Sequence, residues 1–185
     1  LMDDPLARSC GRAVMGCSVS IKDADGTELA RGEVGEVVVS GTNIMAGYWN
    51  KPEQTAAVLK HGGYYTGDMG YLDDDGYLFL VDRSKDMIVS GGENVYSTEV
   101  EEVLYRHPAV LEAAVFGVPD DKWGEAVYAV IVPRPENAEV QPEELIAFCR
   151  EHIGGYKVPK GIDIQHEPLP KSGPGKVLKR ELRAP

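Results

Sequence analysis

The first eighty or so residues have the pattern of short strands separated by turn residues. Two such segments cover residues 17–22 and 35–40; Asp25-Gly26 lies between them and Gly41 follows the second. Segments of this length that are rich in Val and Ile and bounded by Gly and Asp predict short β-strands. We therefore expect a small β-barrel or sandwich layer in this part of the chain.

Two local signals add detail to this β-rich part. Pro52 is followed by good helix formers, which predicts a short helix that begins there. Residues 73–76 read Asp-Asp-Asp-Gly and predict a hairpin turn between strands at 69–72 and 77–81. An acidic cluster can also bind calcium, but this one lacks the ligand spacing of a helix–loop–helix calcium site, so the turn is the preferred interpretation.

After Lys85 the pattern changes to alternating strands and helices. Apolar and β-branched runs predict strands at residues 87–90, 94–96, 113–118, 126–132 and 162–165. Apolar residues at helical spacing predict two helices, one after Ser97 and Thr98 and one that Pro142 opens. Thr98 and Glu101 fit a capping box at the start of the first helix.

These patterns predict an α/β (α+β) chain of two parts. Residues 1–84 are expected to form the small β-barrel-like segment. Residues 85–185 are expected to form a compact lobe with a short mixed sheet flanked by helices, a size within the usual range for a domain.

Charge is distributed unevenly along the 185 residues. The net charge of -11 argues against a nucleic-acid-binding protein, because neutralising phosphates needs a clustered excess of Lys and Arg. The end of the chain differs, since five basic residues lie between Lys171 and Arg183 against the single acid Glu181. Charge alone leaves two interpretations open, a solubilising helix end or a surface that attracts a polyphosphate.

Cysteine and histidine usage excludes several kinds of site. Cys10, Cys17 and Cys149 are odd in number and lack CxxC spacing, which supports neither a disulfide framework nor a zinc site. The four histidines show no metal-ligand spacing, so no metal site is expected among these residues. No apolar run is long enough to cross a bilayer and the start does not resemble a signal peptide, so a cytoplasmic location is expected.

Three short motifs follow one another in a fixed order along the chain. Residues 64–68 read Tyr-Tyr-Thr-Gly-Asp, residues 82–86 read Asp-Arg-Ser-Lys-Asp, and residues 170–176 read Pro-Lys-Ser-Gly-Pro-Gly-Lys. Each motif is weak evidence by itself, because Gly turns and surface Lys are common. As an ordered set they resemble the adenylate-forming superfamily of acyl-CoA synthetases, peptide-synthetase adenylation domains and luciferases, over nearly the whole chain.

This resemblance implies that only the last part of such an enzyme is present. No Ser/Thr/Gly-rich phosphate loop precedes residue 60, and most of the acyl pocket would lie upstream. Residues 1–84 would be the end of the large N-terminal adenylation domain, and residues 85–185 would be its mobile C-terminal lid. The chain is therefore expected to be inactive without the missing N-terminal domain, its natural partner.

The resemblance also assigns roles in the first half-reaction. Asp68 would hold the ribose of ATP, although an isolated Thr-Gly-Asp is more often a turn cap, and Arg83 would help to bind the same nucleotide. Lys85 occupies the family's hinge position. Lys176 would bind ATP and act as the catalytic lysine that bridges the carboxylate and the α-phosphate, with Mg²⁺ neutralising the other phosphates.

For the second half-reaction the resemblance implies contacts with CoA. Gly91 and Gly92 would let backbone approach the thin pantetheine arm, or would simply form a hairpin turn. Trp123 would pack against the coenzyme, or would be a partly buried core aromatic. Lys157 and Lys160 would meet CoA phosphates, and the family acid at Glu99 would have a structural role.

Together these assignments predict an ATP-dependent carboxylate–CoA ligase that acts on a small-molecule carboxylate. Asp82 stands where peptide-synthetase types usually have Gly before the hinge-region Arg, which favours CoA over a carrier-protein thiol. Three alternatives stay open: loading of a carrier protein, a non-catalytic binding module and, weakest, a basic tail that binds nucleic acid.

Overall fold

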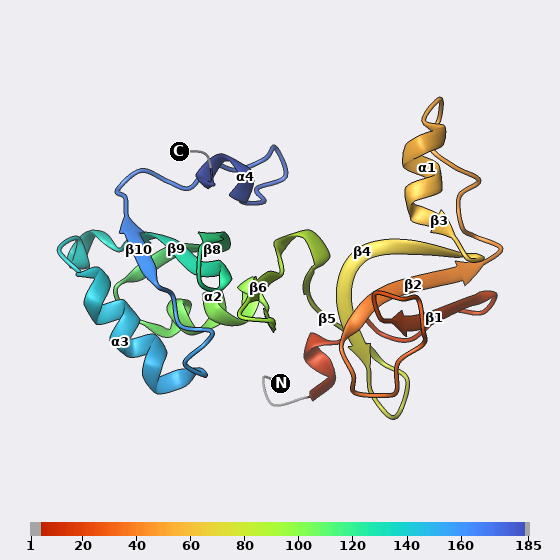
Figure 1. The fold of residues 1–185 in the computed structure, drawn as a ribbon, viewed down its shortest axis with the longest axis horizontal. Helices are drawn as coiled ribbons and strands as arrows, with labels where there is room; N and C mark the ends of the chain where they lie inside the picture. Colours follow the sequence, from red (N-terminus) through yellow and green to blue (C-terminus); the bar gives the residue numbers. More distant parts are fainter. Residues whose placement is uncertain (1–4, 184–185) are drawn as a thin grey trace. The chain divides into compact units, whose positions relative to one another are not determined.

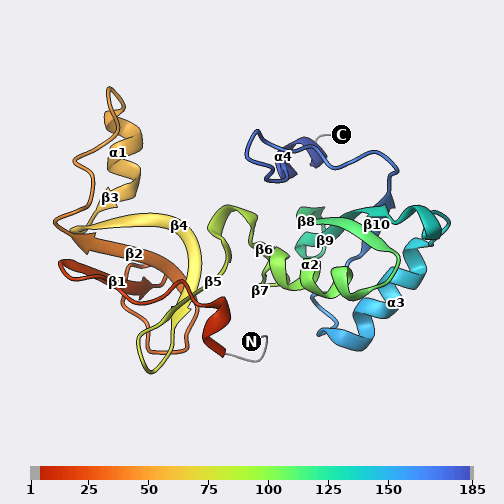
Figure 2. The ribbon, with the colours of Figure 1, turned by 180° about the vertical axis from the view of Figure 1, so that it is seen from behind.

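A computed structural model describes residues 5–183 of the chain. The chain divides into two compact units, residues 1–85 and 86–185. Each unit has its own five-stranded sheet and its own hydrophobic core. Figures 1 and 2 show both units as ribbons. The mixed α/β fold that the sequence predicts is confirmed.

The first unit is built on one antiparallel sheet that curls into a half-barrel (Figure 1). Its strands are β1 (Cys17–Lys22), β2 (Gly35–Gly41), β3 (Leu59–Lys60), β4 (Gly63–Leu72) and β5 (Leu78–Arg83). Their order is β1-β2-β4-β3, and β5 also pairs with β4. The short helices are η1 (Pro5–Arg8), α1 (Pro52–Val58) and η2 (Ser84–Asp86).

Local sequence signals account for the main turns of this unit. The acidic run at residues 73–76 makes the predicted hairpin turn, in which Gly76 donates to the carbonyl of Asp73 at 3.0 Å and has φ +81. Pro52 opens α1 as expected. The core packs Ile21, Val37 and Leu72 on the inner face of the curled sheet.

The second unit has a mixed sheet. Its strands are β6 (Ile88–Ser90), β7 (Glu93–Val95), β8 (Val110–Asp120), β9 (Gly124–Pro133) and β10 (Gly161–Ile164). The sheet order is β10-β9-β6-β7, with β8 beside β9, and only the β10–β9 pairing is parallel. Its helices are α2 (Ser97–Arg106), η3 (Pro135–Asn137), α3 (Pro142–His152) and α4 (Lys179–Leu182).

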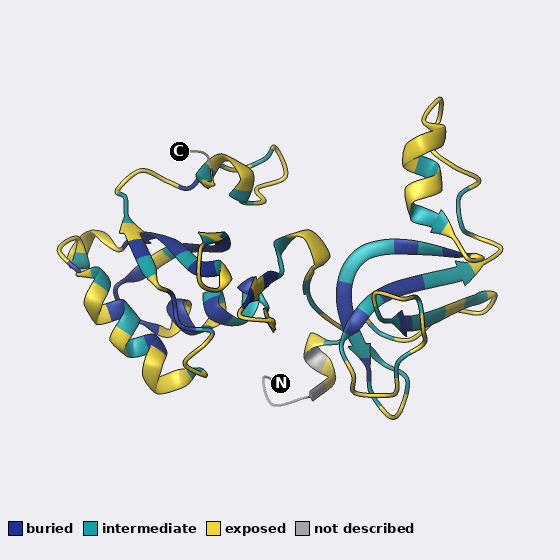
Figure 3. Ribbon diagram, viewed as in Figure 1, coloured by how far each residue is buried: buried dark blue, intermediate teal, exposed yellow. Residues whose placement is uncertain are grey.

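The long β8–β9 ribbon is buried on both faces, as the dark strands in Figure 3 show. Alternate residues such as Ala113 and Val115 face α2 and α3 in the larger core. The intervening residues, including Ala114 and Phe116, pack against the segment after β10. Burial on both faces explains why these strands read as continuous apolar runs rather than as an alternating pattern.

The helix α2 starts two residues before the start that a capping box of Thr98 and Glu101 implies. The helix begins at Ser97 and its N-cap is Tyr96. The carboxylate of Glu101 binds two groups far from the start of α2: its Oε1 accepts from the backbone N–H of Val115 at 2.9 Å and lies 2.8 Å from Nζ of Lys179. Among residues 5–183, no helix combines the length and apolar character that a membrane span requires.

Candidate functional site

In the first unit the candidate site is a bulge in β4. Pairing with β2 passes from Val38–Tyr65 to Glu36–Met69, so Val37 alone faces the residues between Tyr65 and Met69. Gly67 lies in this bulge with φ +74, a conformation that glycine adopts without steric strain. The bulge therefore interrupts the regular ladder next to Asp68.

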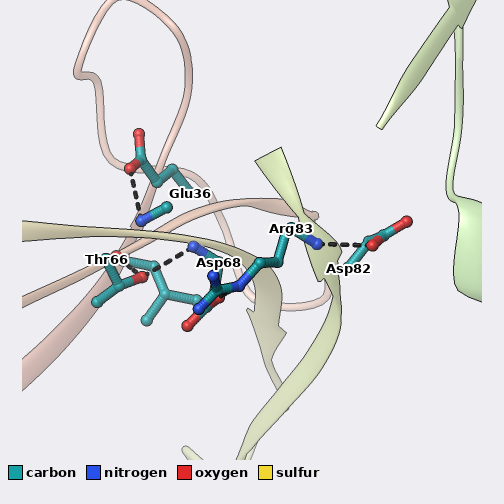
Figure 4. Close-up of polar contacts among 7 residues, drawn as sticks. Glu36, Thr66, Asp68, Asp82 and Arg83 are labelled. Carbon is teal, nitrogen blue, oxygen red and sulfur yellow. Dashed lines mark hydrogen bonds and ion pairs between the residues drawn. The ribbon is translucent and has the colours of Figure 1, made fainter. Parts of the chain in front are cut away.

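Three hydrogen bonds fix the shape of this bulge (Figure 4). The hydroxyl of Thr66 donates to the carbonyl of Val37 at 2.8 Å and accepts from the N–H of Asp68 at 3.1 Å. The N–H of Gly67 donates to Oε1 of Glu36 at 3.1 Å. The backbone N–H groups that the bulge takes out of the ladder are thus satisfied by side chains.

Asp68 and Arg83 form the charged centre of the site. They lie opposite each other on β4 and β5, and Nε of Arg83 is 3.0 Å from Oδ1 of Asp68. Their side chains are 29% and 45% exposed, so the pair adds little to stability. The contact uses one carboxylate oxygen and one of five guanidinium N–H groups, which leaves acceptor and donor capacity for a ligand.

Tyr64 adds a neutral hydroxyl to this surface. A hydrogen bond with Tyr48, together with the nearby carboxylate of Asp68, raises the pKa of Tyr64 above its ordinary value. The phenol therefore stays protonated at neutral pH. Lys85 follows in η2, exposed to solvent, at the point where the chain divides into its two units.

Lys176 lies in a hydrogen-bonded hairpin turn of the second unit. Lys171 and Val177 form a β-bridge. Within the turn, the N–H of Ser172 donates to the carbonyl of Lys176 at 2.8 Å, and Ser172 Oγ accepts from the N–H of Lys176 at 3.2 Å. The side chain of Lys176 is exposed, and no carboxylate among residues 5–183 pairs with its ammonium group.

The structure brings Gly91, Gly92 and Trp123 together at one end of the β8–β9 ribbon. The N–H of Gly91 donates to the carbonyl of Trp123 at 2.8 Å. A Cβ at Gly91 would lie 2.8 Å from Cε3 of Trp123, so the indole packs directly on the glycine backbone. Trp123 remains 41% exposed, and the ammonium of Lys122 lies 4.6 Å from the centre of an indole ring.

Glu125 is a residue of this site that sequence reasoning missed. Its Oε2 accepts from the backbone N–H of Val89 at 2.8 Å, next to the single β6–β9 pair of Ser90 with Gly124. Its carboxylate lies over Gly117, where an added Cβ would be 2.9 Å from Cδ. The available signal was its place two residues after Trp123, but a surface Glu has no distinctive pattern.

Lys157 and Lys160 differ in their surroundings. The ammonium of Lys157 lies 2.7 Å from both carboxylate oxygens of Glu99. Burial lowers the pKa of Lys157, but the hydrogen bond and charge of Glu99 outweigh it and raise that pKa above its ordinary value. Lys160 is exposed, and its backbone N–H donates to the carbonyl of Val127 at 2.8 Å.

Comparison with protein families identifies the chain. The AMP-binding enzyme C-terminal domain matches residues 99–176, and the AMP-binding enzyme family matches residues 1–49. The chain belongs to the AMP-binding enzyme family. The adenylate-forming resemblance drawn from the three motifs is thereby confirmed.

Its AMP-binding relatives include named CoA ligases. A feruloyl-CoA synthase of an Amycolatopsis species is 48% identical over 89% of this chain and 33% of its own length. A long-chain-fatty-acid–CoA ligase of Bacillus subtilis is 51% identical over 81% of this chain and 26% of its own length. The chain thus spans about a third or less of the length of the curated relatives it matches.

Several solved structures share the fold closely. The ATP-bound MatB of Rhodopseudomonas palustris superposes with a TM-score of 0.89 at 35% identity, over 97% of this chain and 36% of that one. The o-succinylbenzoate CoA synthetase of Bacillus subtilis, in complex with its acyl-adenylate, gives 0.86 at 38% identity, over 96% and 36%. The amide bond synthetase McbA of Marinactinospora thermotolerans gives 0.85 at 44% identity, over 96% and 36%.

Proposed function

We propose that these residues are the catalytic C-terminal part of an ATP-dependent carboxylate–CoA ligase. In the first step a carboxylate oxygen attacks the α-phosphorus of ATP and pyrophosphate leaves, which yields an acyl-adenylate. In the second step the sulfur of CoA attacks the acyl carbonyl and AMP leaves, which yields an acyl-CoA. The observation that carries this proposal is the exposed ammonium of Lys176, unpaired within residues 5–183, on an ordered hairpin.

Lys176 supplies the charge that the first step needs. A carboxylate and a triphosphate repel each other, so a compact cation between them stabilises the transition state by electrostatics. A lysine already neutralised by a carboxylate would be a weaker partner, and Lys176 has none in the described part of the chain. The nucleotide would reach this unit as MgATP, and no residue here is assigned to Mg²⁺, because residues 5–183 contain no cluster of metal-ligating side chains.

Asp68 and Arg83 would bind the ribose and its neighbouring phosphate. The carboxylate of Asp68 has lone pairs for two adjacent hydroxyls, while the side chain of Arg83 holds it in place at 3.0 Å. The neutral phenol of Tyr64 adds a donor beside that carboxylate.

The surface of Gly91, Gly92 and Trp123 would receive the thiol substrate in the second step. No Cβ narrows the approach at Gly92, where an added Cβ would meet no atom within 4 Å, and the half-exposed indole of Trp123, which covers Gly91, offers an apolar face to a pantetheine arm. Lys160 would meet a CoA phosphate. Lys157 would contribute to the CoA site indirectly, through the ion pair that its ammonium group forms with Glu99. A rotation about Lys85 would exchange this surface for Lys176.

The three cysteines are free thiols, which fits a reducing, cytoplasmic setting. The 185 residues alone should not form acyl-CoA, since the resemblance puts the phosphate loop and acyl pocket upstream. We therefore assign the activity to the full-length protein.

A pair of lysine variants of the full-length protein tests the proposal. Lys176→Ala should lose ATP–pyrophosphate exchange by about 10²-fold or more, over a panel of carboxylates, yet still convert preformed acyl-adenylate to acyl-CoA. Lys160→Ala, an exposed lysine of the same unit, should keep exchange and raise the KM for CoA. Exchange that survives in Lys176→Ala would refute the catalytic role of Lys176, and a wild type that no carboxylate activates would exclude the ligase assignment.

The acceptor of the acyl group is tested separately. The acyl-adenylate is offered three acceptors in turn: free CoA, a phosphopantetheinyl carrier protein and a simple amine. The amine is included because one structural neighbour is named an amide bond synthetase. Fastest transfer to CoA supports the ligase. Faster transfer to the carrier protein or the amine would reassign the second step and leave the first unchanged.

A further inference from the structure

The segment after β10 crosses the second face of the β8–β9 ribbon and carries Lys176. It is held by packing and by charge on both sides of that residue. Leu169, Val177 and Leu182 pack with Phe116 in one apolar cluster. Two ion pairs flank the Lys176 turn, one formed by Lys171 and the other by Lys179.

The first anchor is Glu112 on β8. Its Oε1 pairs with the ammonium of Lys171, and its Oε2 accepts from the backbone N–H of Leu169 at 3.0 Å. Both carboxylate oxygens therefore hold the segment that leads into the turn. The hydrogen bond from Lys171 keeps the pKa of Glu112 below its ordinary value, so the carboxylate is charged at neutral pH.

The second anchor is Lys179, at the start of α4. Its ammonium lies 2.8 Å from Oε1 of Glu101 and 2.6 Å from the hydroxyl of Ser97, which is fully buried. The side chains of Lys179 and Glu101 are only 14% and 17% exposed. Removing one member of so buried a pair leaves the other charge without its partner in a poorly solvated place, which is strongly unfavourable.

Solvent-exposed cations in the same segment behave differently. Arg180 is adjacent to Lys179, its side chain is 82% exposed, and its guanidinium is 3.9 Å from Glu181. The second unit thus binds the side chain of Lys179, whereas the side chain of the adjacent Arg180 faces water. This contrast indicates that Lys179 forms a specific contact with Glu101 and Ser97, beyond a general attraction between α4 and the acidic surface.

We propose that Glu101 and Glu112 are positioning residues for Lys176. Through Lys179 and Lys171 they fasten the Lys176 hairpin to the second unit at both ends. Lys176 then reaches and leaves the nucleotide only as the whole unit moves, and the hairpin does not swing by itself. The proposal deepens the proposed function and rests on it for its catalytic consequence.

Hydrogen exchange and kinetics of the full-length protein test this anchor. Lys179→Met removes the charge and keeps an unbranched side chain; Arg180→Met is the matched control. Lys179→Met should speed amide exchange at Ser172, Gly175, Lys176 and Leu178, whose N–H groups form the turn. It should also slow ATP–pyrophosphate exchange by about 10²-fold, because a small misplacement of a catalytic group has that effect.

The pattern across assays separates positioning from a general loss of fold. In Lys179→Met, conversion of preformed acyl-adenylate by CoA should stay near the wild-type rate, and Lys179→Arg should restore pyrophosphate exchange. Glu112→Gln, which loosens the opposite side of the turn, should repeat the result if Lys179→Met folds poorly. Arg180→Met should change neither readout.

Each outcome decides the proposal. Unchanged amide exchange in both Lys179→Met and Glu112→Gln overturns the anchor, whatever the activity. Faster amide exchange with undiminished pyrophosphate exchange overturns the positioning role. A wild type that lacks pyrophosphate exchange refutes the proposed function, and amide exchange then still decides whether the hairpin is anchored.

Discussion

Gly91→Ala tests the contact that brings the glycine turn and Trp123 together. Gly91 has φ +63 and Gly92 has φ +86, so alanine is strained in a similar way at both positions. Their surroundings differ. A Cβ at Gly91 would lie 2.8 Å from Cε3 of Trp123, whereas a Cβ at Gly92 would meet no atom within 4 Å.

The two substitutions should therefore have different magnitudes. Left-handed backbone in a non-glycine residue costs about 1–2 kcal/mol, and this should be the whole effect of Gly92→Ala. Gly91→Ala adds an overpacking term of about 1–3 kcal/mol, because the indole must move away. The extra destabilisation should disappear when Trp123→Ala is also present, since no ring then occupies that space.

Urea unfolding of the second unit measures these differences. Trp49 is 89% exposed and is the only other tryptophan among the 185 residues, so in this stretch of the protein a Trp49→Phe background makes Trp123 fluorescence the reporter of the second unit. Circular dichroism follows the Trp123→Ala variants. Equal destabilisation by Gly91→Ala and Gly92→Ala, or a Gly91→Ala effect that persists without Trp123, would refute the packing argument.

Three further predictions concern carboxylates and a thiol of the second unit. Glu125→Gln weakens the acceptor for the Val89 N–H at 2.8 Å. This variant should slow acyl transfer to CoA and leave ATP–pyrophosphate exchange unchanged. Equal losses in the two reactions would contradict a role of Glu125 in the CoA step. The pKa of Glu112 is lowered in the folded chain by Lys171, so its contribution to stability is present above the ordinary Glu pKa and is lost as pH falls through the lowered value. The gap in unfolding midpoint between wild type and Glu112→Gln should then close in acid, and a gap independent of pH would exclude the ion pair. Burial raises the pKa of Cys149 to about 11, so iodoacetamide at pH 8 should modify it only after unfolding, as mass spectrometry of the peptide will show.

Local chemistry made much of the fold predictable. The Asp-Asp-Asp-Gly run at residues 73–76 forms its expected turn, Pro142 opens α3, and Gly91-Gly92 joins β6 to β7. In each case the signal and the structure it determines lie within a few residues of each other. Such signals depend on backbone conformation, which the residue type restricts directly.

Partners far apart in sequence could not be predicted in the same way. Lys157 and Glu99 are 58 positions apart, and Lys179 and Ser97 are 82 apart. Lys157 reads as a free surface cation until its partner is seen. The distant partners of Glu101 were equally out of reach, because the local pattern around it says nothing of Lys179 or of the Val115 N–H, both of which its carboxylate binds.

The β8–β9 ribbon links the two proposed halves of the chemistry. The outer face of β8 carries Glu112 and Phe116, which hold the Lys176 segment, and the tip of the ribbon carries Trp123 against Gly91. The ribbon is paired along nearly its full length, so both surfaces belong to one rigid element. A rotation of the second unit at Lys85 would therefore replace one surface by the other without rearranging either, and the anchors described above are what such an exchange requires.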